Sequence, residues 1–566
     1  MDWPQSCMQQ WRGRPHFVIF NASHADGAPL RALLQAWRDD PQRPARLHYI
    51  ALCGDALPGF RRIPQAEPGL TVDLLSATLD QACSQLDARL DAIVLDTIQG
   101  AGSRFAHALG RLAVSDATLV AHGLDFAQRA ALSHAGFAWE GEHCARFTSR
   151  RPQAAPRAGA RRERRAIVLG AGLAGAAACE RLVARGWRVT LVERHAQPAS
   201  EASGNLAGIS MPLLSRDDNL MTRLSRAAFR YALDYWDALG ANPRTQGSPL
   251  VGARCGVLQL ARDAGHAQVQ REIAAAHRYP PQYAQWLGSA AASAMLGSSA
   301  PDGAWLFPQG GWMHPASACG AMLAACGDAL ERRFAQGSVS AAREDGQWCL
   351  LDAAGAPVAR APVLVLAGGA SAVKLAPAAM LPLSAVRGQV THLAAGTGPG
   401  QLPTLPFVLC REAYLTPALN GWHSLGASYD DDDDPHLRAD SQQANLDKIR
   451  SLLDDPAIGI GAPLAGRVGF RCVAPDRLPL VGALPAPRPA GRIERLREVP
   501  RQDGLYGLLG YASRGLIWAP LAAELLAAQL DGEPLPLETE RVQALDPARF
   551  LLREQRRKDV ARPGKV

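Results

Sequence analysis

A thirty-residue segment in the second quarter of the chain constrains the fold more than any other feature. It runs RAIVLGAGLAGAAACERLVARGWRVTLVER over residues 165–194. An apolar run precedes three glycines at GxGxxG spacing, an alanine-rich stretch follows them, and a second apolar run ends in an acid. This order predicts a strand, a tight turn, a helix and a second strand, which is the dinucleotide-binding unit of an α/β fold.

Each glycine of the motif has a mechanical reason. Gly170 permits the tight turn, Gly172 lets the backbone approach a pyrophosphate, and Gly175 lets helix and strand pack closely. Glu193 ends the second apolar run eighteen residues beyond Gly175, where a carboxylate suits a ribose diol. The acid favours FAD or NAD over NADP, and the spacing alone does not choose between the first two.

Length and composition limit the class of protein. A chain of 566 residues predicts two to four domains with buried cores. It is 48% apolar and 20% charged, no apolar run reaches eighteen residues, and the first residues contain no signal-peptide core, so we expect a soluble, cytoplasmic protein without a membrane partner. Eleven scattered cysteines without a CxxC pair predict reduced thiols rather than disulfides or zinc.

Arginine is concentrated in two places, although the formal charge is only +7. Eight arginines lie between residues 146 and 165. The second basic cluster consists of Arg553, Arg556, Arg557, Lys558, Arg562 and Lys565. In an arbitrary protein such clusters are most often a solvated linker and a frayed tail, and the alternative is a phosphate-binding surface.

The changes in pattern along the chain predict its domains. Residues 150–165 are rich in Pro, Ala and Arg and interrupt the apolar periodicity, so we expect a boundary there. Before it, short apolar runs alternate with amphipathic stretches, which indicates a parallel α/β sheet. The predicted parts are a front domain (1–150), a basic linker (151–165), a nucleotide-binding enzyme domain (166–550, its cofactor halves at 166–240, 360–380 and 470–550 with a mixed-sheet substrate domain between) and a basic tail (551–566).

Four further segments carry a resemblance to a known family. They are EASGNLAGISMPLLSRDDN (201–219), LPLSAVRGQVTHL (381–393), GRVGFRCVAPDRLPLVGALP (466–485) and GYASRGLIWAPLAAELLA (510–527). Together they resemble the flavoprotein half of the MnmC family, bifunctional proteins that finish 5-methylaminomethyl-2-thiouridine at the tRNA wobble position. The resemblance implies an FAD-binding fold of the D-amino acid oxidase and glycine oxidase type, with tRNA, through its anticodon loop, as partner.

The resemblance also implies the reaction. The substrate would be 5-carboxymethylaminomethyluridine, whose side group is a glycine joined through its nitrogen. Hydride leaves the glycyl methylene carbon for the flavin, the imine takes up water, and glyoxylate departs from an aminomethyluridine. Such a reaction needs a cation for the carboxylate, and the planar fork of arginine suits it best.

Four residues are candidates for the substrate site. Arg471 in FRCVAPDRLP and Arg514 in YASRGL are similar in place to the carboxylate-binding arginines of glycine oxidases. Arg387 in VRGQ is a third candidate, and Tyr414 in YLTP is a candidate hydrogen-bond donor to the carboxylate. A structural ion pair, a phosphate contact or ordinary packing remain the alternatives for these side chains.

The resemblance implies three flavin-contacting segments in addition to the glycine motif. The first is a turn at Ser203, Gly204 and Asn205, and the second is AGGA at 367–370, with Gly368 as its candidate residue. The third precedes a C-terminal helix whose N-terminus would face the flavin's pyrimidine edge. Its candidate residues are Gly510, Ser513 and Gly515.

The acidic run Asp430–Asp434 has the composition of a metal site. It is followed by Pro435 and lies in a polar stretch, which favours a solvated turn, so we expect no metal.

The front domain resembles the family's methyltransferase half in degenerate form. Asn21 stands where that half has an acid, Ser23 and Ala25 replace glycines of the methyl-donor loop, and Pro29 removes a backbone donor. Cys53 occupies the position of a ribose-binding acid. We therefore expect a Rossmann-like domain in which S-adenosylmethionine binding and methyl transfer are weak or lost, and which serves as a platform for tRNA.

Two other functions fit the same residues. An FAD oxidase of free glycine or D-amino acids would share the flavin site and the arginines. A catalytically idle tRNA-binding protein that retains flavin for stability would share the fold.

Overall fold

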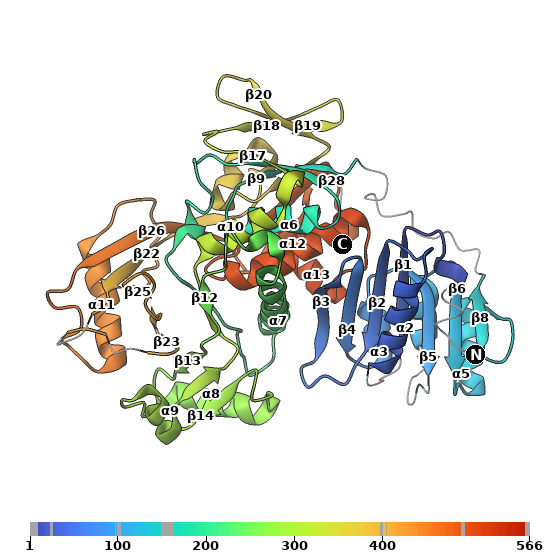
Figure 1. Ribbon diagram of the computed structural model, residues 1–566, viewed down its shortest axis with the longest axis horizontal. Helices are drawn as coiled ribbons and strands as arrows, with labels where there is room; N and C mark the ends of the chain where they lie inside the picture. The colour runs from blue at the N-terminus through green and yellow to red at the C-terminus, as the bar shows by residue number, and fades with distance from the viewer. Residues whose placement is uncertain are drawn as a thin grey trace. The chain divides into compact units, whose positions relative to one another are not determined.

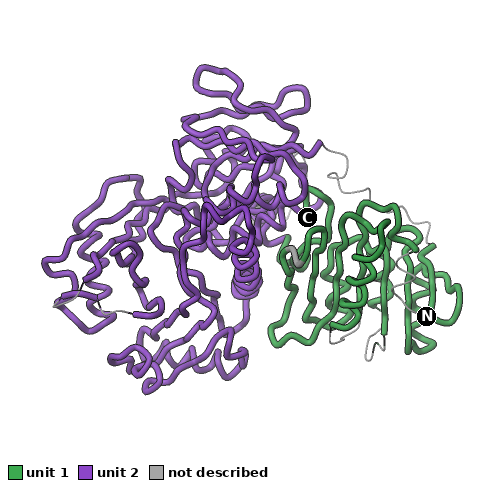
Figure 2. Tube along the Cα trace, viewed as in Figure 1, with its two compact units in different colours: residues 1–162, 528–542 green, residues 163–527, 543–566 purple. Residues whose placement is uncertain are grey.

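The computed structural model describes residues 9–22, 27–96, 98, 104–148, 163–396, 400–402, 405–487 and 493–560. The chain divides into unit 1, residues 1–162 with 528–542, and unit 2, residues 163–527 with 543–566 (Figure 2). Most of the predicted basic linker, residues 151–162, lies outside the described residues. None of the described helices is long and apolar enough to cross a membrane, and the described cysteines are free thiols.

Unit 1 is built on an eight-stranded sheet whose central strands are parallel (Figure 1). In sheet order the strands are β3 (Gly59–Glu67), β4 (Leu70–Ser76), β2 (Arg46–Leu52), β1 (His16–Asn21), β5 (Leu90–Asp96), β6 (Ala113–His122), β8 (Cys144–Phe147) and β7 (Phe137–Trp139). Strand β1 pairs with both β2 and β5, so the direction of strand succession reverses at β1. This is the open α/β sheet expected of a Rossmann-like domain.

Four helices connect the strands of unit 1. They are α2 (Ala28–Asp39), α3 (Leu79–Gln85), α4 (Arg104–Leu112) and α5 (Phe126–Ala135). Thr78 begins α3 and Asp125 begins α5 through reciprocal capping boxes, which satisfy backbone donors at each helix start. Helix α2 begins differently, after Gly27 in a left-handed conformation with Pro29 in its first turn and without a side-chain cap.

Unit 2 contains the predicted dinucleotide-binding sheet. In order its six strands are β17 (Leu330–Arg333), β10 (Arg188–Val192), β9 (Arg165–Leu169), β21 (Val363–Leu366), β28 (Arg501–Leu509) and β27 (Leu480–Pro485). The first five run parallel and β27 runs antiparallel. Because β9 and β10 belong to the glycine-motif segment whereas β21 and β28 come from much later in the chain, the substrate-binding part is inserted between halves of this sheet.

Three more sheets complete unit 2. A three-stranded sheet joins β11 (Gly208–Ser210), β16 (Gly311–Met313) and β12 (Gly252–Ala253), and another joins β18 (Ser340–Glu344), β19 (Gln347–Leu351) and β20 (Pro357–Ala361). The large mixed sheet has the order β14 (Gln285–Leu287), β15 (Ala304–Phe307), β13 (Val257–Leu260), β23 (Val408–Cys410), β24 (Tyr414–Leu415), β25 (Trp422–Gly426), β22 (Ser384–Ala394) and β26 (Leu464–Val473). This is the inserted mixed-sheet domain that we expected.

The helices of unit 2 cover these sheets (Figure 1). They are α6 (Leu173–Val183), α7 (Leu220–Gly240), α8 (Ala264–His277), α9 (Ser289–Leu296), α10 (Pro315–Ala325), α11 (Ala439–Leu453), α12 (Gly515–Asp531) and, after the segment assigned to unit 1, α14 (Arg549–Val560). Helix α13 (Thr539–Leu545) begins in unit 1 and ends in unit 2.

The C-terminal region differs from our expectation in two respects. Residues 528–542 group with unit 1, although we assigned them to the oxidoreductase domain. Much of the predicted basic tail is the helix α14, in which Arg549 and Arg553 pair with Asp476. Asp476, more than seventy positions earlier in the chain, thus forms ion pairs with residues at the start of this helix.

Candidate active site

The three predicted flavin-contacting glycines follow three neighbouring parallel strands. Gly170 comes directly after β9, Gly368 comes two residues after β21, and Gly510 comes directly after β28. The carboxyl ends of parallel strands meet at one edge of a sheet, which is where α/β folds bind nucleotides. The sheet therefore gathers residues that lie 340 positions apart in sequence at one edge.

The glycine motif has the geometry that a dinucleotide turn requires. Gly170 adopts a φ of +109°, and a Cβ there would lie 2.8 Å from the Cα of Gly368. A Cβ on Gly175 would lie 1.8 Å from the carbonyl oxygen of Gly170, so helix α6 approaches the turn too closely for any side chain. A Cβ on Gly172 would lie 2.9 Å from Oγ of Ser203. The backbone NH groups at the start of α6 thus stand at this edge, as an anion site needs.

Glu193 lies at the end of β10 beside this turn. Its Oε2 accepts a hydrogen bond from the backbone NH of Ala171 at 2.7 Å, and its Oε1 accepts one from that of His195 at 2.9 Å. Each carboxylate oxygen has a second lone-pair direction. The carboxylate is therefore fixed in place with acceptor capacity left for a ribose hydroxyl.

The predicted turn at Ser203–Asn205 packs on the start of α6. It forms a 3₁₀ turn over Ala202–Gly204, and Oγ of Ser203 accepts a hydrogen bond from the backbone NH of Leu173 at 3.1 Å. The predicted AGGA segment begins a second 3₁₀ turn over Gly369–Lys374, next to the glycine motif. Both turns therefore border the same edge of the sheet.

The segment before α12 reaches the same place. Gly510 has a φ of +78°, and the backbone NH of Ala512 donates to the carbonyl of Cys472 at 2.9 Å. Ser513 is exposed in the turn that follows. A Cβ on Gly515 would lie 2.9 Å from Leu173 Cδ1, so the N-terminus of α12 lies against that of α6. Helix α12 continues through Pro520. It is the C-terminal helix expected after this segment, but α13 and α14 follow it, so it is not the last helix of the chain.

One face of the large sheet carries the predicted substrate residues. Cys410 pairs with Tyr414, Tyr414 with Gly426, Gly426 with Val390, and Val390 with Arg467. Directly paired residues point to the same face, and so do residues two apart in one strand. Arg471, four positions after Arg467 in β26, therefore belongs to this face, which we call the substrate face.

The substrate face is turned toward the flavin-contacting turns through β26. A Cβ on Gly469 would lie 3.5 Å from the Cα of Ala202, and Arg467 donates to the carbonyl of Ser200 at 2.6 Å. The opposite face is covered by α11, where Asn445 donates to the carbonyl of Gln389 at 3.0 Å. The sheet thus separates a packed side from a side that meets the cofactor edge.

Arg471 lies on the substrate face as a cation without a carboxylate partner among the described residues. Its Nη1 donates to the carbonyls of Ser428 at 3.1 Å and Arg387 at 3.3 Å, and its guanidinium carbon lies 5.3 Å from the ring centre of Tyr429. Burial lowers its pKa from the ordinary value. A guanidinium that burial destabilises and that lacks an ion pair is suited to an anionic ligand.

Tyr414 interacts with Arg471, and Arg514 is connected to the same group of side chains through Cys410. Arg514 has no ion pair within the described parts of the chain and donates only to the carbonyl of Met211, at 3.4 Å. Burial lowers the pKa of Arg514. Burial raises the pKa of Tyr414, and the positive charge of Arg471 partly offsets this rise. The thiol of Cys410, whose pKa burial raises to about 12, interacts with both Arg514 and Tyr414. Three of the four predicted substrate residues are therefore brought together.

The fourth, Arg387, is elsewhere, and that expectation was wrong. It is paired with Phe470 in the register of β22 and β26, so it points to the face opposite Arg471. Its side chain is fully buried, and its guanidinium donates to Asp430 Oδ2 at 2.9 Å and to the carbonyls of Asp434 and His436. The VRGQ motif places a structural arginine there, because strand side chains alternate between faces.

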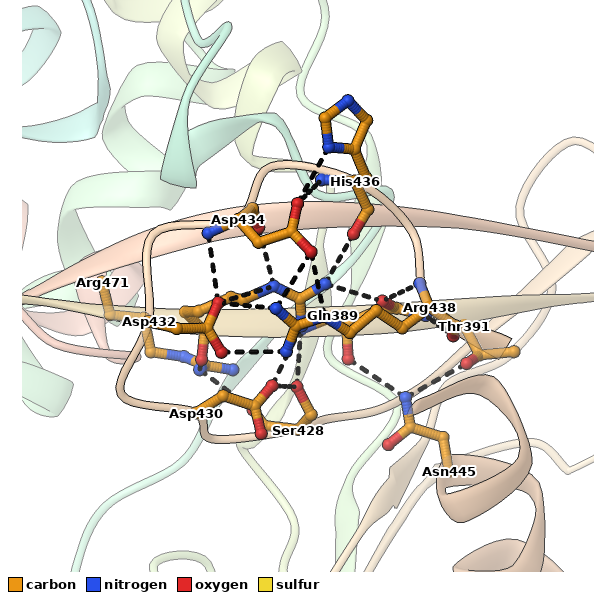
Figure 3. Close-up of polar contacts among 11 residues, drawn as sticks. Gln389, Thr391, Ser428, Asp430, Asp432, Asp434, His436, Arg438, Asn445 and Arg471 are labelled. Atoms are coloured by element: carbon orange, nitrogen blue, oxygen red, sulfur yellow. Dashed lines mark hydrogen bonds and ion pairs between the residues drawn. The ribbon is translucent and has the colours of Figure 1, made fainter. Parts of the chain in front are cut away.

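The acidic run is a solvent-accessible loop, as expected, but alternate acids in it form ion pairs (Figure 3). Asp430 pairs with Arg387, while Asp432 and Asp434 pair with Arg438 at 2.9 Å each. Hydrogen bonds from the backbone and side chain of His436, followed by that from Arg438, hold the pKa of Asp434 below its ordinary value. The sequence shows five consecutive aspartates, so the one signal for these ion pairs was Arg438, four positions after the run.

Sequence reasoning missed three residues of the substrate face or its rim. Arg467 donates to Asn205 Oδ1 at 3.4 Å as well as to Ser200, and its pKa is lowered by burial. His392 is two residues beyond Val390 in β22, and burial, with Arg467, lowers its pKa. Tyr429 packs on Arg471. The even spacing of Arg467 and Arg471 within one strand would have indicated a shared face.

The chain is similar in sequence to characterised families over nearly its whole length. Residues 165–529 match the family model of FAD dependent oxidoreductases. The "tRNA 5-methylaminomethyl-2-thiouridine biosynthesis bifunctional protein MnmC" of Azoarcus sp. (strain BH72) is 40% identical over 97% of this chain and 92% of that protein. The protein of the same name from Burkholderia thailandensis is 40% identical over 98% of this chain and 93% of its own length.

Solved structures support the fold of unit 2. Glycine oxidase from Geobacillus kaustophilus superposes with a TM-score of 0.57 at 20% identity, over 68% of this chain and 99% of that one. Iminodiacetate oxidase from Chelativorans sp. BNC1 gives a TM-score of 0.54 at 24% identity, over 66% and 98%. The cofactor edge, the family model and the near full-length relatives agree, and the chain belongs to the MnmC family, with an FAD-dependent oxidoreductase of the glycine-oxidase fold in residues 165–529.

Proposed function

We propose that this protein removes the carboxymethyl group from 5-carboxymethylaminomethyl-(2-thio)uridine at the wobble position of tRNA, leaving 5-aminomethyluridine and glyoxylate. One observation carries the proposal. Arg471 and Arg514 are partly buried cations without an ion pair in the described chain; Arg471 adjoins Tyr414 on the sheet face that meets the cofactor edge, and Arg514 interacts with Cys410, the strand partner of Tyr414. Such a pair suits the carboxylate of an amino acid unit.

The residues of unit 2 fit FAD. The crowded turn at Gly170–Gly175 and the fixed carboxylate of Glu193 suit the pyrophosphate and a ribose. The start of α12 is suited to negative charge on the pyrimidine edge of the flavin. When bound, FAD supplies a two-electron acceptor for the hydride of the glycyl methylene carbon.

The side chains of the substrate face hold the substrate. A guanidinium binds a carboxylate through two parallel hydrogen bonds, and this fixes the methylene carbon that follows. Tyr414 stays protonated because burial raises its pKa, so its hydroxyl remains a donor. Loss of hydride and of the amine proton forms a C=N bond, water adds across it, and the C–N bond breaks to release glyoxylate and the primary amine.

The relatives support tRNA as the substrate. Their name refers to the biosynthesis of 5-methylaminomethyl-2-thiouridine in tRNA, and this chain spans more than nine-tenths of each. The wobble uridine of the anticodon loop is where the family resemblance puts the reacting group. The arginine-rich segment 146–165 is the candidate phosphate-binding region, and most of it lies outside the described residues.

We further propose that methyl transfer from S-adenosylmethionine is weak or lost in unit 1. Asn21 ends β1 with its amide donating to the hydroxyl of Tyr49 at 2.8 Å, and burial raises the pKa of that tyrosine to about 12. The amide is thus occupied in the core at the position where the family has an acid. Gly27 and Pro29 start α2 without a capping side chain, whereas Ser23 and Ala25 lie outside the described residues.

Anaerobic mixing tests the proposed function. Purified protein carrying flavin is mixed with tRNA bearing 5-carboxymethylaminomethyluridine, the flavin absorbance is followed, and the tRNA is digested for nucleoside analysis. We expect bleaching with aminomethyluridine as the product, and no methylated nucleoside after S-adenosylmethionine is added. Bleaching by free glycine or D-amino acids but not by tRNA would establish the amino acid oxidase instead, and flavin that no substrate reduces would indicate a binding protein.

A further inference from the structure

Tyr429 is an aromatic side chain left in solvent beside the candidate carboxylate site. Its side chain is 58% exposed, whereas most large apolar side chains of the described residues are buried. Four of the five large apolar side chains that stand exposed fall within residues 429–464. They are Tyr429, Leu437, Ile460 and Leu464. A single exposed apolar side chain is common, so the significance of Tyr429 lies in its place beside the candidate carboxylate site.

The position of the ring is set by Arg471. The guanidinium carbon lies 5.3 Å from the ring centre, and Nη1 of the same arginine donates to the carbonyl of Ser428, the residue before Tyr429. One part of the ring therefore lies against the cation that would hold the substrate carboxylate. The 58% exposure leaves much of the remaining ring surface open.

The backbone on both sides of Tyr429 is fixed. Ser428 donates from its backbone NH to the carbonyl of Gln389 at 3.1 Å and from its hydroxyl to Asp430 at 2.6 Å. Asp430 and Arg387 exchange two backbone hydrogen bonds at 3.0 Å, and their side chains form an ion pair. Because this network already fixes the backbone around Tyr429, little conformational entropy of the backbone is lost when a ligand binds to the ring.

We propose that Tyr429 is the stacking platform for the uracil ring that carries the reacting group. The inference rests on the proposed function, because it requires a nucleobase attached to the glycyl unit. Only two carbons and a nitrogen separate C5 of the uracil from the carboxylate, so a carboxylate bound by Arg471 brings the base close to the ring of Tyr429. Proteins bind unpaired bases by stacking them on aromatic side chains.

Stacking accounts for a specificity that the arginines do not supply. Arg471 and Arg514 recognise a carboxylate and thus fit any N-substituted glycine. The exposed ring adds a planar surface that favours an aromatic heterocycle at the far end of the substrate. Tyr429 is therefore a positioning residue that raises affinity for the nucleoside, while the arginines align the methylene carbon.

The test compares Tyr429→Leu with Tyr429→Phe, and uses Ile460→Ala as a control that removes another exposed apolar side chain. The dissociation constant for tRNA bearing 5-carboxymethylaminomethyluridine and the limiting rate of flavin reduction at saturating tRNA are measured on flavin-loaded protein. We expect Tyr429→Leu to weaken binding roughly 5- to 100-fold, because base stacking on an aromatic contributes that much, and to leave the limiting rate unchanged. Tyr429→Phe keeps the ring and should keep the affinity, and Ile460→Ala should match the wild type.

Two results would overturn the stacking role. Unchanged affinity in Tyr429→Leu shows that the base does not contact the ring. A lower limiting rate with unchanged affinity shows that the ring acts only through Arg471. Failure of the proposed function is a different result, visible in the wild type as flavin that this tRNA does not reduce.

Discussion

At the scale of single residues, the unpaired guanidinium groups of Arg471 and Arg514 carry the most information. Burying a cation without a counter-charge is costly, so a protein retains it where a ligand supplies the charge. Arg387, the fully buried arginine of the neighbouring strand, instead has Asp430 as its partner. The contrast between these arginines separates the binding residues from the structural one.

Replacing Arg471 with lysine tests the fork geometry. Lysine keeps the charge but cannot make two parallel hydrogen bonds to a carboxylate, so we expect flavin reduction by tRNA to have a kcat/KM lower by about 10- to 100-fold, equivalent to the roughly 1.5–3 kcal/mol of one charged hydrogen bond. Arg387→Lys should instead lower the melting temperature. Equal losses of kcat/KM in both variants, at equal stability, would place Arg387 in the site after all.

The sequence contained the identities of the site residues but not all of their directions. GxGxxG was sufficient to predict the crowded turn after β9, and the two arginine motifs contained the two arginines of the candidate carboxylate site. Arg387 was misassigned because its motif does not reveal the register of β22 against β26. A shift of one residue along β22 moves a side chain to the other face of the sheet. Tyr429 is preceded and followed by polar residues and acquires its place only from the network around it.

At the scale of elements, the close approach of α6 to β9 controls cofactor binding. A methyl group on Gly175 would lie 1.8 Å from the Gly170 carbonyl, so Gly175→Ala must push the helix away from the turn. We expect this variant to be isolated with little or no flavin, as measured by the ratio of flavin to protein absorbance. Gly320→Ala in α10, where a Cβ meets nothing within 4 Å, is the control and should retain full flavin.

Helix α14 is attached to the segment that follows Arg471. Asp476 makes two 2.9 Å hydrogen bonds to Arg549 and also pairs with Arg553. Burial alone would raise the pKa of Asp476, but Arg549 and Arg553 outweigh it and the pKa lies below its ordinary value. A carboxyl with a depressed pKa in the folded state stabilises the fold above its unfolded pKa of about 4, and this stabilisation is lost as the pH falls through the folded value.

Urea unfolding of the wild type and Asp476→Asn at a series of pH values checks this contribution. The difference in unfolding free energy should be largest above about pH 5 and should shrink as the pH falls below about 4. A difference that does not vary with pH would show that the pair contributes no charge-dependent stability.

At the scale of the whole molecule, the chain returns to unit 1 after the oxidoreductase. Residues 528–542 pack on the front sheet: Arg46 pairs with Asp531 at 2.7 Å, and the carboxylate of Glu538 accepts from the backbone NH of Phe60 at 3.1 Å. Arg62, fully buried, binds both Asp73 and the carbonyl of Pro534. Neither segment alone contains a signal for this pairing, because its partners lie more than four hundred residues apart.

Breaking the buried pair tests the coherence of unit 1. Arg62→Met leaves the buried carboxylate of Asp73 with only His48 as its partner, so we expect a loss of up to about 3–5 kcal/mol in the stability of unit 1. Hydrogen exchange should then rise in residues 46–76 and in 528–542 together. Arg38→Met removes an exposed ion pair with Glu67 and should change the stability of unit 1 far less. Faster exchange confined to one of the two segments would contradict a single packed unit.

The central claim is that the glycyl methylene carbon, held by Arg471 and Arg514, is the atom oxidised. The most direct measurement is single-turnover flavin reduction by tRNA whose 5-carboxymethylaminomethyl group is deuterated at that methylene, with glyoxylate and aminomethyluridine quantified in the same sample. We expect a primary isotope effect on the reduction rate, and one glyoxylate and one aminomethyluridine for each flavin reduced. Reduction without an isotope effect and without glyoxylate, or reduction by free amino acids alone, would contradict it.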